Sequence, residues 1–274
     1  MKIPEPLLSW LLEGDPSIAF QAKRDLLGVS GKGLDKAQSE IARRRWGKAF
    51  LEKQGENGHW GRGLYQPKWI CTHYTKLDLK TLGIEAGTAG CVRGTQQLLE
   101  STPGCNGGIN YARTIAYSDV CINGMLLNIA GYFHSTVCVL EGLAEYQKTK
   151  NTRRQQEVKT AIAQGAEFLL AHRLYRSHRT NAIVDPRMLR LSFPCRWHYD
   201  ILRGLEVFWS LGLPYDKRMS DAIEQVLKKR RPDGTWPLQA KHPGETHFEM
   251  EKVGAPSRWN TLRALRTLKY LGAL

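Results

Sequence analysis

The segment Gln54-Gly55-Glu56-Asn57-Gly58-His59-Trp60 is the first of three similar turns in this chain. The others are Asn106-Gly107-Gly108-Ile109 and Pro232-Asp233-Gly234-Thr235-Trp236. Each turn places Asn or Asp before a glycine, which suits the positive φ of a tight turn. An aromatic or branched apolar residue stands two positions after that glycine and can anchor the turn in a core. The three turns therefore indicate a supersecondary unit that the chain uses repeatedly.

Helices are expected around these turns, because apolar residues recur there at spacings of three and four. A helical stretch from Ile223 to Arg230 comes before the third turn. The clearest helices expected after the turns are Thr72 to Leu82, Asp119 to Ala130, Trp197 to Leu211 and Ser257 to Leu271. No alternating run bounded by hairpin turns indicates a strand. The sequence therefore predicts an all-α chain.

Two of the expected helices share a sequence frame. Pro194-Cys195-Arg196-Trp197 is matched by Pro256-Ser257-Arg258-Trp259, 62 residues later, and apolar and arginine positions follow both. We interpret the two segments as equivalent helices of one closed array. This interpretation predicts a single domain that covers residues 1–274.

The pattern Q-x-x-x-G-x-W of the first turn resembles the repeat of squalene–hopene cyclases, whose fold protein prenyltransferase β subunits share. The segments DVCINGM (119–125), RWHYDILR (196–203) and PSRWNTLRAL (256–265) resemble bacterial proteins described as squalene-cyclase-like. The resemblance implies an α/α toroid, with inner and outer helices around a central cavity. It is specific for fold and weak for chemistry, because one fold hosts many reactions.

The expected inner helices are unevenly spaced. Two of them would begin at Asp119 and His134, only 15 residues apart, whereas the other gaps are 47, 63 and 60 residues. We favour the loss of about 40 residues, one helical repeat, with the ring left incomplete or disordered near residues 131–136. The alternative is one long helix over residues 119–146, bent near Gly131.

The acids of the terpenoid cyclases are missing. The resemblance would require a D-x-D-D cluster for protonation or a D-D-x-x-D cluster for magnesium. This chain has ten aspartates, and no two lie within four residues of each other. Protonation chemistry of the squalene type is therefore not expected.

The resemblance to prenyltransferases implies a zinc site. Those enzymes bind zinc through an Asp-x-Cys and a histidine that opens another inner helix. Asp119, Cys121 and His134 match these positions and form a reasonable zinc set with one coordination position open. The alternative is a cysteine that is simply a small core residue, with a histidine that caps a helix.

A second candidate site is cationic and aromatic. Arginine and histidine beside tryptophan at a cavity mouth would bind an anionic head group, while the rings flank an apolar portion. The candidate substrate-binding residues are Arg196, Trp197, Arg203, Arg258, Trp259, Asn260 and Tyr74. The candidate catalytic residues are His198, Asp200 and His73. The alternative is that the arginines join neighbouring helices by pairing with buried acids or carbonyl groups.

The composition favours an anionic partner. Forty Lys and Arg against 26 acids give a net charge of +14. Basic runs such as HRLYRSHR (172–179) occur without a recognised nucleic-acid-binding module. No apolar window is long enough to span a membrane, which leaves peripheral membrane contact open. The six cysteines form no C-x-x-C pair, and no secretory signal is recognisable, so we expect a cytoplasmic protein with reduced thiols.

Three functions remain open at this point. The first is an enzyme that acts on a prenyl-like or otherwise amphipathic anion, with zinc or with a His–Asp pair. The second is a non-catalytic toroid that binds a ligand or partner in its cavity. The third is an α/α-barrel carbohydrate enzyme, which would need paired carboxylates.

Overall fold

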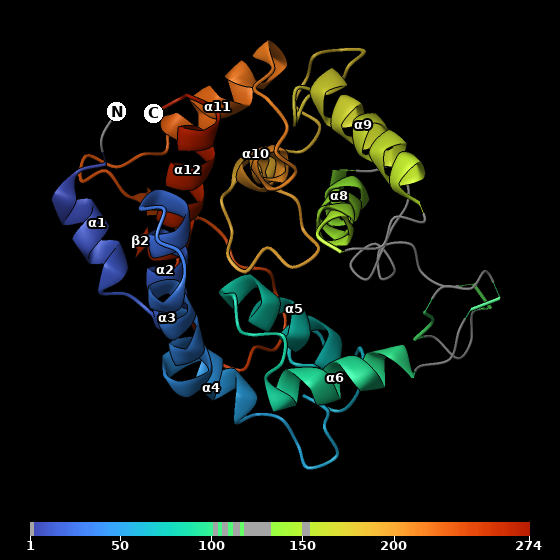
Figure 1. Ribbon diagram of the computed structural model, residues 1–274. Helices are drawn as coiled ribbons and strands as arrows, with labels where there is room; N and C mark the ends of the chain where they lie inside the picture. Colours follow the sequence, from blue (N-terminus) through green and yellow to red (C-terminus); the bar gives the residue numbers. More distant parts are fainter. Residues whose placement is uncertain (1–2, 101–103, 106–108, 112–115, 118–132, 150–153) are drawn as a thin grey trace. The chain divides into compact units, whose positions relative to one another are not determined.

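The computed structural model describes residues 3–100, 104–105, 109–111, 116–117, 133–149 and 154–274. Over these residues the chain is mostly helical, with one two-stranded antiparallel sheet (Figure 1). The all-α prediction is therefore confirmed. Residues 106–108 of the second turn, the expected helix from Asp119 to Ala130 and the two candidate zinc ligands in it lie outside the described residues.

The chain groups into two compact units. Unit 1 comprises Met1–Thr102 and Arg231–Leu262, and unit 2 comprises Pro103–Arg230 and Arg263–Leu274. Helix α12 (Arg258–Tyr270) contributes residues to both units. The single-domain expectation therefore stays a prediction.

Unit 1 contains a succession of helices that pack against their sequence neighbours. Its described helices are α1 (Glu5–Leu12), α2 (Pro16–Gln21), α3 (Lys32–Arg43), α4 (Arg45–Leu51), α5 (Thr72–Leu82), α6 (Ala89–Leu99) and the first residues of α12. A π-helical turn, Ala22–Leu26, extends α2. Strands β1 (Trp236–Pro237) and β2 (Pro256–Ser257) pair just before α12 begins.

Unit 2 is built around α8 (Phe133–Gln147). This helix packs against α9 (Gln155–Ala171) and α10 (Ile201–Ser210), and α10 packs against α11 (Ser220–Leu227). The described part of this unit also includes two short 3-10 turns, Pro186–Leu189 and Lys217–Met219, and the last residues of α12. Because α8 begins at Phe133 and residues 118–132 lie outside the description, both explanations of the short helix spacing stay open.

The first turn is held by its own backbone and by α5. The Gly55 N–H donates to the His59 carbonyl at 2.8 Å, and the Asn57 side chain accepts from the His59 N–H at 3.1 Å. Gly58 has a φ of +82°, which explains the glycine at this position. The fully buried Trp60 donates its N–H to the Thr72 hydroxyl at the start of α5, at 3.1 Å.

The third turn repeats these contacts. The Arg231 N–H donates to the Thr235 carbonyl at 2.8 Å, and the Asp233 side chain accepts from the Thr235 N–H at 3.0 Å. Gly234 has a φ of +83°. Trp236 is again fully buried, and its N–H donates to the Thr261 hydroxyl on α12 at 2.9 Å. The two segments therefore adopt the same local structure, as their sequences predicted.

The two P-x-R-W segments do not adopt equivalent positions. Helix α12 begins at Arg258, inside its segment, whereas α10 begins at Ile201, after its segment has ended. The two N-caps show the true correspondence: Asp200 accepts from a backbone N–H three residues later, and so does Ser257. The register in which the shared frame aligns the two helix starts is therefore wrong, because different residues cap the two helices. The equivalence of α10 and α12 in one closed array stays a prediction.

None of the described helices is long and apolar enough to cross a membrane.

Candidate functional site

Arg203, on α10, is buried and forms a two-pronged ion pair with α8. Its Nε and Nη2 donate to the two carboxylate oxygens of Glu141 at 2.8 and 2.7 Å. Its Nη1 donates to the His198 carbonyl at 2.6 Å. All the nitrogens of the guanidinium are thus engaged within unit 2, where the side chain joins two helices. These contacts fit the alternative in which the arginine joins neighbouring helices by pairing with an acid, here the half-buried Glu141, and substrate binding by Arg203 stays a prediction.

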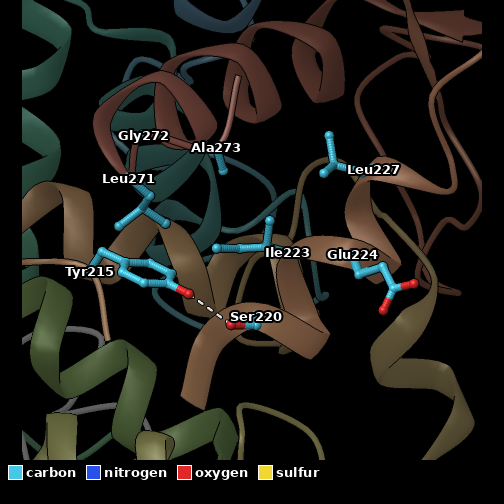
Figure 2. Close-up of a pocket in the computed structure, with 8 residues that line it drawn as sticks. All are labelled: Tyr215, Ser220, Ile223, Glu224, Leu227, Leu271, Gly272 and Ala273. Carbon is cyan, nitrogen blue, oxygen red and sulfur yellow. Dashed lines mark hydrogen bonds between the residues drawn. The ribbon is translucent and has the colours of Figure 1, made fainter. Parts of the chain in front are cut away.

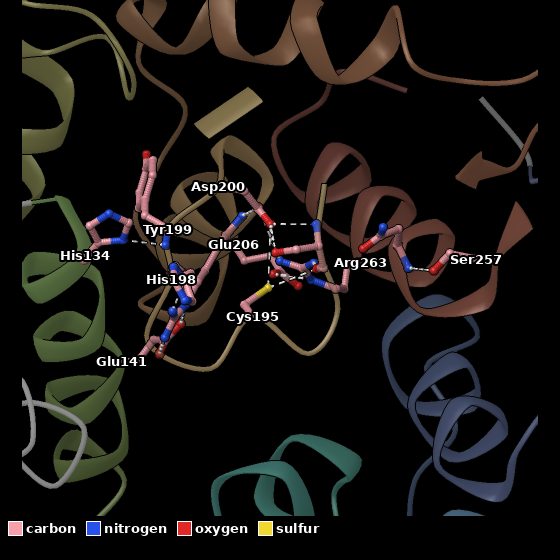
Figure 3. Close-up of polar contacts among 12 residues, drawn as sticks. His134, Glu141, Cys195, His198, Tyr199, Asp200, Glu206, Ser257 and Arg263 are labelled. Carbon is pink, nitrogen blue, oxygen red and sulfur yellow. Dashed lines mark hydrogen bonds and ion pairs between the residues drawn. The ribbon is translucent and has the colours of Figure 1, made fainter. Parts of the chain in front are cut away.

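Asp200 is 1% exposed and serves as the N-cap of α10. Its Oδ1 accepts from the Arg203 N–H at 2.8 Å, and its Oδ2 accepts from the N–H and the hydroxyl of Ser192, both at 3.1 Å. Cys195 Sγ lies 3.7 Å from the same Oδ2 (Figure 3). One carboxylate oxygen therefore caps α10 and the other holds Ser192, which is a structural role beside the predicted catalytic one.

A second buried charge cluster surrounds Glu206. Its two carboxylate oxygens accept from Arg263 Nε at 2.7 Å and from Arg266 Nη2 at 2.8 Å. Arg263 also donates to the Ser192 carbonyl at 3.0 Å and lies 3.7 Å from Asp200. Sequence reasoning missed Glu206 and Glu141, because an acid on a helix carries no local sign of the distant arginine that it will meet.

Three half-buried side chains of unit 2 form an aromatic cluster, which we define as His134, Trp197 and His198. Figure 3 shows the two histidines of this cluster. The rings of Trp197 and His198 stack, with centroids 3.8 Å apart and planes 24° apart. The His134 ring meets Trp197 edge-on at 5.2 Å and His198 at 6.0 Å. Three of the predicted site residues are therefore brought together here.

The hydrogen bonding of His134 fixes its tautomer. The backbone N–H of Tyr199 donates to His134 Nδ1 at 2.7 Å, so Nδ1 carries a lone pair and the proton of the neutral ring sits on Nε2. Burial lowers the pKa of His134, and the charge of Arg203 lowers it further. His134 is therefore a neutral imidazole near pH 7, with Nε2–H as a donor.

This arrangement does not fit zinc ligation by His134. A zinc ion on Nε2 would require the ring proton to move to Nδ1, where it would face the Tyr199 N–H. A zinc ion on Nδ1 would displace that N–H. Among the residues that the structure describes, no group of three or more His, Cys, Asp or Glu side chains could hold a metal. Because Asp119 and Cys121 lie outside that part of the chain, the predicted zinc set itself stays a prediction.

His73 and Tyr74 lie in unit 1, at the start of α5. Both are buried, and Tyr65 packs against them, with its ring 5.6 Å from His73 and its hydroxyl 3.1 Å from that of Tyr74. Burial lowers the pKa of His73 to about 4, so this ring is neutral near pH 7. Catalysis by His73 and ligand contact by Tyr74 stay predictions.

The α12 candidates are engaged within unit 1. Arg258 lies over the Trp10 ring at 4.5 Å and donates to the Trp10 carbonyl at 2.9 Å. The buried Trp259 stacks on Trp46, with centroids 6.5 Å apart. Asn260 Nδ2 donates to a carbonyl of β1 at 3.0 Å. The contacts described for these α12 residues are with protein groups, and their ligand-binding role stays a prediction.

Arg196 lies in unit 2, where it is buried and has a φ of +54°. Its ligand-binding role also stays a prediction.

A groove of about 440 Å³ lies elsewhere in unit 2, beside α11 (Figure 2). Ile223, Leu227 and Leu271 line it with apolar surface, and the hydroxyls of Tyr215 and Ser220 hydrogen-bond at 2.7 Å on its rim. None of the predicted site residues lines this groove.

No family model, curated protein or solved structure matches this chain.

Proposed function

We propose that the chain is an α/α toroid of the squalene-cyclase and prenyltransferase type. Two observations support this: the chain is mostly helical, and two turns of related sequence share their backbone hydrogen bonds and their buried tryptophan. In both segments the backbone N–H of the tryptophan donates to a threonine hydroxyl near the start of the following helix. A closed ring of inner and outer helices would need such a unit several times over.

The proposed function is the binding of an amphipathic anion at the aromatic cluster His134–Trp197–His198. The observation that carries it is the fixed Nε2–H donor of His134 beside two stacked, half-buried rings. A neutral imidazole with a fixed donor can stabilise an oxyanion without becoming charged. The ring faces supply the apolar contact that a prenyl-like tail would need.

Two further charges act on His134, those of Asp185 and Arg187. The Arg187 side chain is 86% exposed and lies 2.7 Å from Asp185. Beyond burial and Arg203, which lower the pKa of His134, Asp185 raises this pKa and Arg187 lowers it, so the two charges of the ion pair oppose each other at the ring. An anionic head group would therefore depend on the Nε2–H donor of His134 and on ring contact more than on charge.

We favour ligand binding over a reaction in which Asp200 is the catalytic residue. A general acid or base needs a proton or lone pair directed at the substrate, and both oxygens of this carboxylate accept hydrogen bonds from α10 and Ser192. An enzyme that acts on the same ligand would depend on Asp119 and Cys121, which the structure does not describe.

The test is calorimetric titration with farnesyl diphosphate, with farnesol as the uncharged control. We expect binding of the diphosphate, weaker binding of farnesol, and an affinity at least tenfold lower in Trp197→Ala. Trp10→Ala, the same substitution in unit 1, should bind as the wild type does. No binding by the wild type, or an equal loss in both variants, would refute the proposal. Release of diphosphate during the incubation would instead make the chain an enzyme.

A further inference from the structure

Two histidines face each other where α9 ends. His172 is the C-cap of α9 and is half-buried, while His178 is exposed on the segment that follows. His172 Nε2 and His178 Nδ1 are 3.2 Å apart, and the ring centroids are 4.9 Å apart at an interplanar angle of 78°. The pair lies outside the aromatic cluster and shares no residue with it.

The tautomer of His172 is fixed by its neighbours. Its Nδ1 lies 2.8 Å from the Phe168 carbonyl, which can only accept, so the ring proton is on Nδ1 and Nε2 carries the lone pair. The ring packs between Phe168, at 4.4 Å, and Phe133, at 5.3 Å. Metal-binding histidines commonly donate their second nitrogen to a backbone carbonyl, because this orients the ring and makes the ligand nitrogen more basic. His172 already has this arrangement.

The spacing of the two nitrogens fits one metal ion. Imidazole nitrogens bind zinc at about 2.0–2.1 Å in tetrahedral sites, which places two such nitrogens about 3.3 Å apart. The separation between His172 Nε2 and His178 Nδ1 is 3.2 Å. In the absence of a metal, the same distance suits a hydrogen bond from the His178 Nδ1–H to His172.

We propose that His172 and His178 bind a divalent transition-metal ion through these two nitrogens, with water in the remaining positions. The proton of His178 moves from Nδ1 to Nε2 when the ion binds, so both rings stay neutral and no proton is released overall. Imidazole ligands suit Cu²⁺, Ni²⁺ and Zn²⁺, and Cu²⁺ binds most tightly in a site of this kind. Acid weakens binding, because protons compete for the imidazole lone pairs.

This site is independent of the zinc set that the resemblance to prenyltransferases implies. It uses neither Cys121 nor His134, and its two protein ligands leave coordination positions open to solvent. Since His178 is exposed, its replacement leaves the packing of α9 intact. The two metal hypotheses can therefore be separated by single substitutions.

The experiment is calorimetric titration of protein without a polyhistidine tag, using Ni²⁺ and Cu²⁺. We expect one ion per chain in the wild type and an affinity at least tenfold lower in His178→Ala. His242→Ala, which removes a histidine of unit 1, and Cys121→Ala should both bind as the wild type does. Electron paramagnetic resonance of the Cu²⁺ form should show nitrogen couplings that diminish in His178→Ala.

The proposal is overturned if the wild type binds neither ion, or if His178→Ala binds them as tightly as the wild type does. It is equally overturned if Cys121→Ala abolishes binding while His178→Ala retains it. Circular dichroism of His178→Ala should match the wild type, which confirms that the comparison concerns the site and not the fold.

Discussion

Replacing Glu206 by glutamine tests the buried charge cluster of unit 2 most directly. The Glu206 side chain is 13% exposed, and its partners Arg263 and Arg266 are 4% and 12% exposed. Glutamine keeps the shape and one accepting oxygen but removes the negative charge. Two guanidinium groups would then face a neutral amide with little water to solvate them.

The expected loss follows from the contacts that remain. Removing one partner of a buried ion pair destabilises a protein by about 3–5 kcal/mol. Here Arg263 keeps the Ser192 carbonyl at 3.0 Å and Asp200 at 3.7 Å, which reduces the penalty. We therefore expect a loss of about 2–4 kcal/mol in the free energy of unfolding. At roughly 2–4 °C per kcal/mol for a chain of this size, Tm should fall by roughly 4–16 °C.

The effect should depend on pH in a defined direction. Burial raises the pKa of Glu206, but the charges of Arg263 and Arg266 outweigh it and hold the pKa below its ordinary value of 4.5. A carboxylate with a lowered pKa stabilises the fold above its unfolded-state pKa, and this contribution is lost as the pH falls through the folded-state pKa. The stability gap between wild type and Glu206→Gln should therefore be widest near pH 7 and narrow below pH 4.5.

The assay is urea and thermal unfolding followed by circular dichroism. The matched control is Glu145→Gln, which neutralises the exposed partner of Lys148 and should change stability by less than about 0.5 kcal/mol. If Glu206→Gln is no less stable than Glu145→Gln at pH 7, the reasoning about the buried cluster is wrong.

Three further predictions concern single contacts. Asp200→Ala should lower the free energy of unfolding by about 2–4 kcal/mol, because it removes the cap of α10 and leaves the polar groups of Ser192 without their acceptor. Asp200→Asn should lower it clearly less in the same urea titration, and equal losses would contradict the capping role. Burial lowers the pKa of His73 from 6.5 to about 4, so acid favours the unfolded state across that window, at about 1.4 kcal/mol per pH unit or roughly 3 kcal/mol in all. In His73→Phe the free energy of unfolding should change correspondingly less between pH 6.5 and 4. An unchanged slope of this free energy against pH would refute the reasoning. Thr72→Val and Thr261→Val should each lower the free energy of unfolding by about 1–3 kcal/mol, measured by thermal unfolding. The reason is that each substitution leaves the backbone N–H of a buried tryptophan without its acceptor. A loss in only one of the two variants would contradict the equivalence of the two turns.

Local signals predicted the helices well where both ends were encoded in the sequence. The helix expected from Thr72 to Leu82 is α5, with the same bounds, and α12 lies within one residue of its expected bounds at each end. The start of α10 was placed four residues too early, because apolar spacing does not register a cap. The signal was present, since Asp200 directly before the apolar run is a favoured N-cap residue.

The sequence indicated which residue types the candidate site contains, but not which acid pairs with which arginine. Arg203 and Glu141 are 62 residues apart in sequence, and Arg263 and Glu206 are 57 apart. Each pair depends on how two helices pack, which no local pattern records. The sequence could indicate that buried arginines need acids or carbonyl groups, but not which of the 16 glutamates would supply them.

The chain has a net charge of +14, but the arginines that first suggested an anion site do not supply positive charge at the aromatic cluster. Arg203 is neutralised by Glu141, and Arg258 is held over the Trp10 ring in unit 1. A ligand at the cluster would instead meet the neutral donor of His134 and the stacked faces of Trp197 and His198. Recognition there would rest on hydrogen-bond direction and ring contact more than on charge, which suits a ligand with a substantial apolar part. A simple phosphate would be bound more strongly by exposed arginines and lysines elsewhere on the surface, where its charge is the dominant attraction.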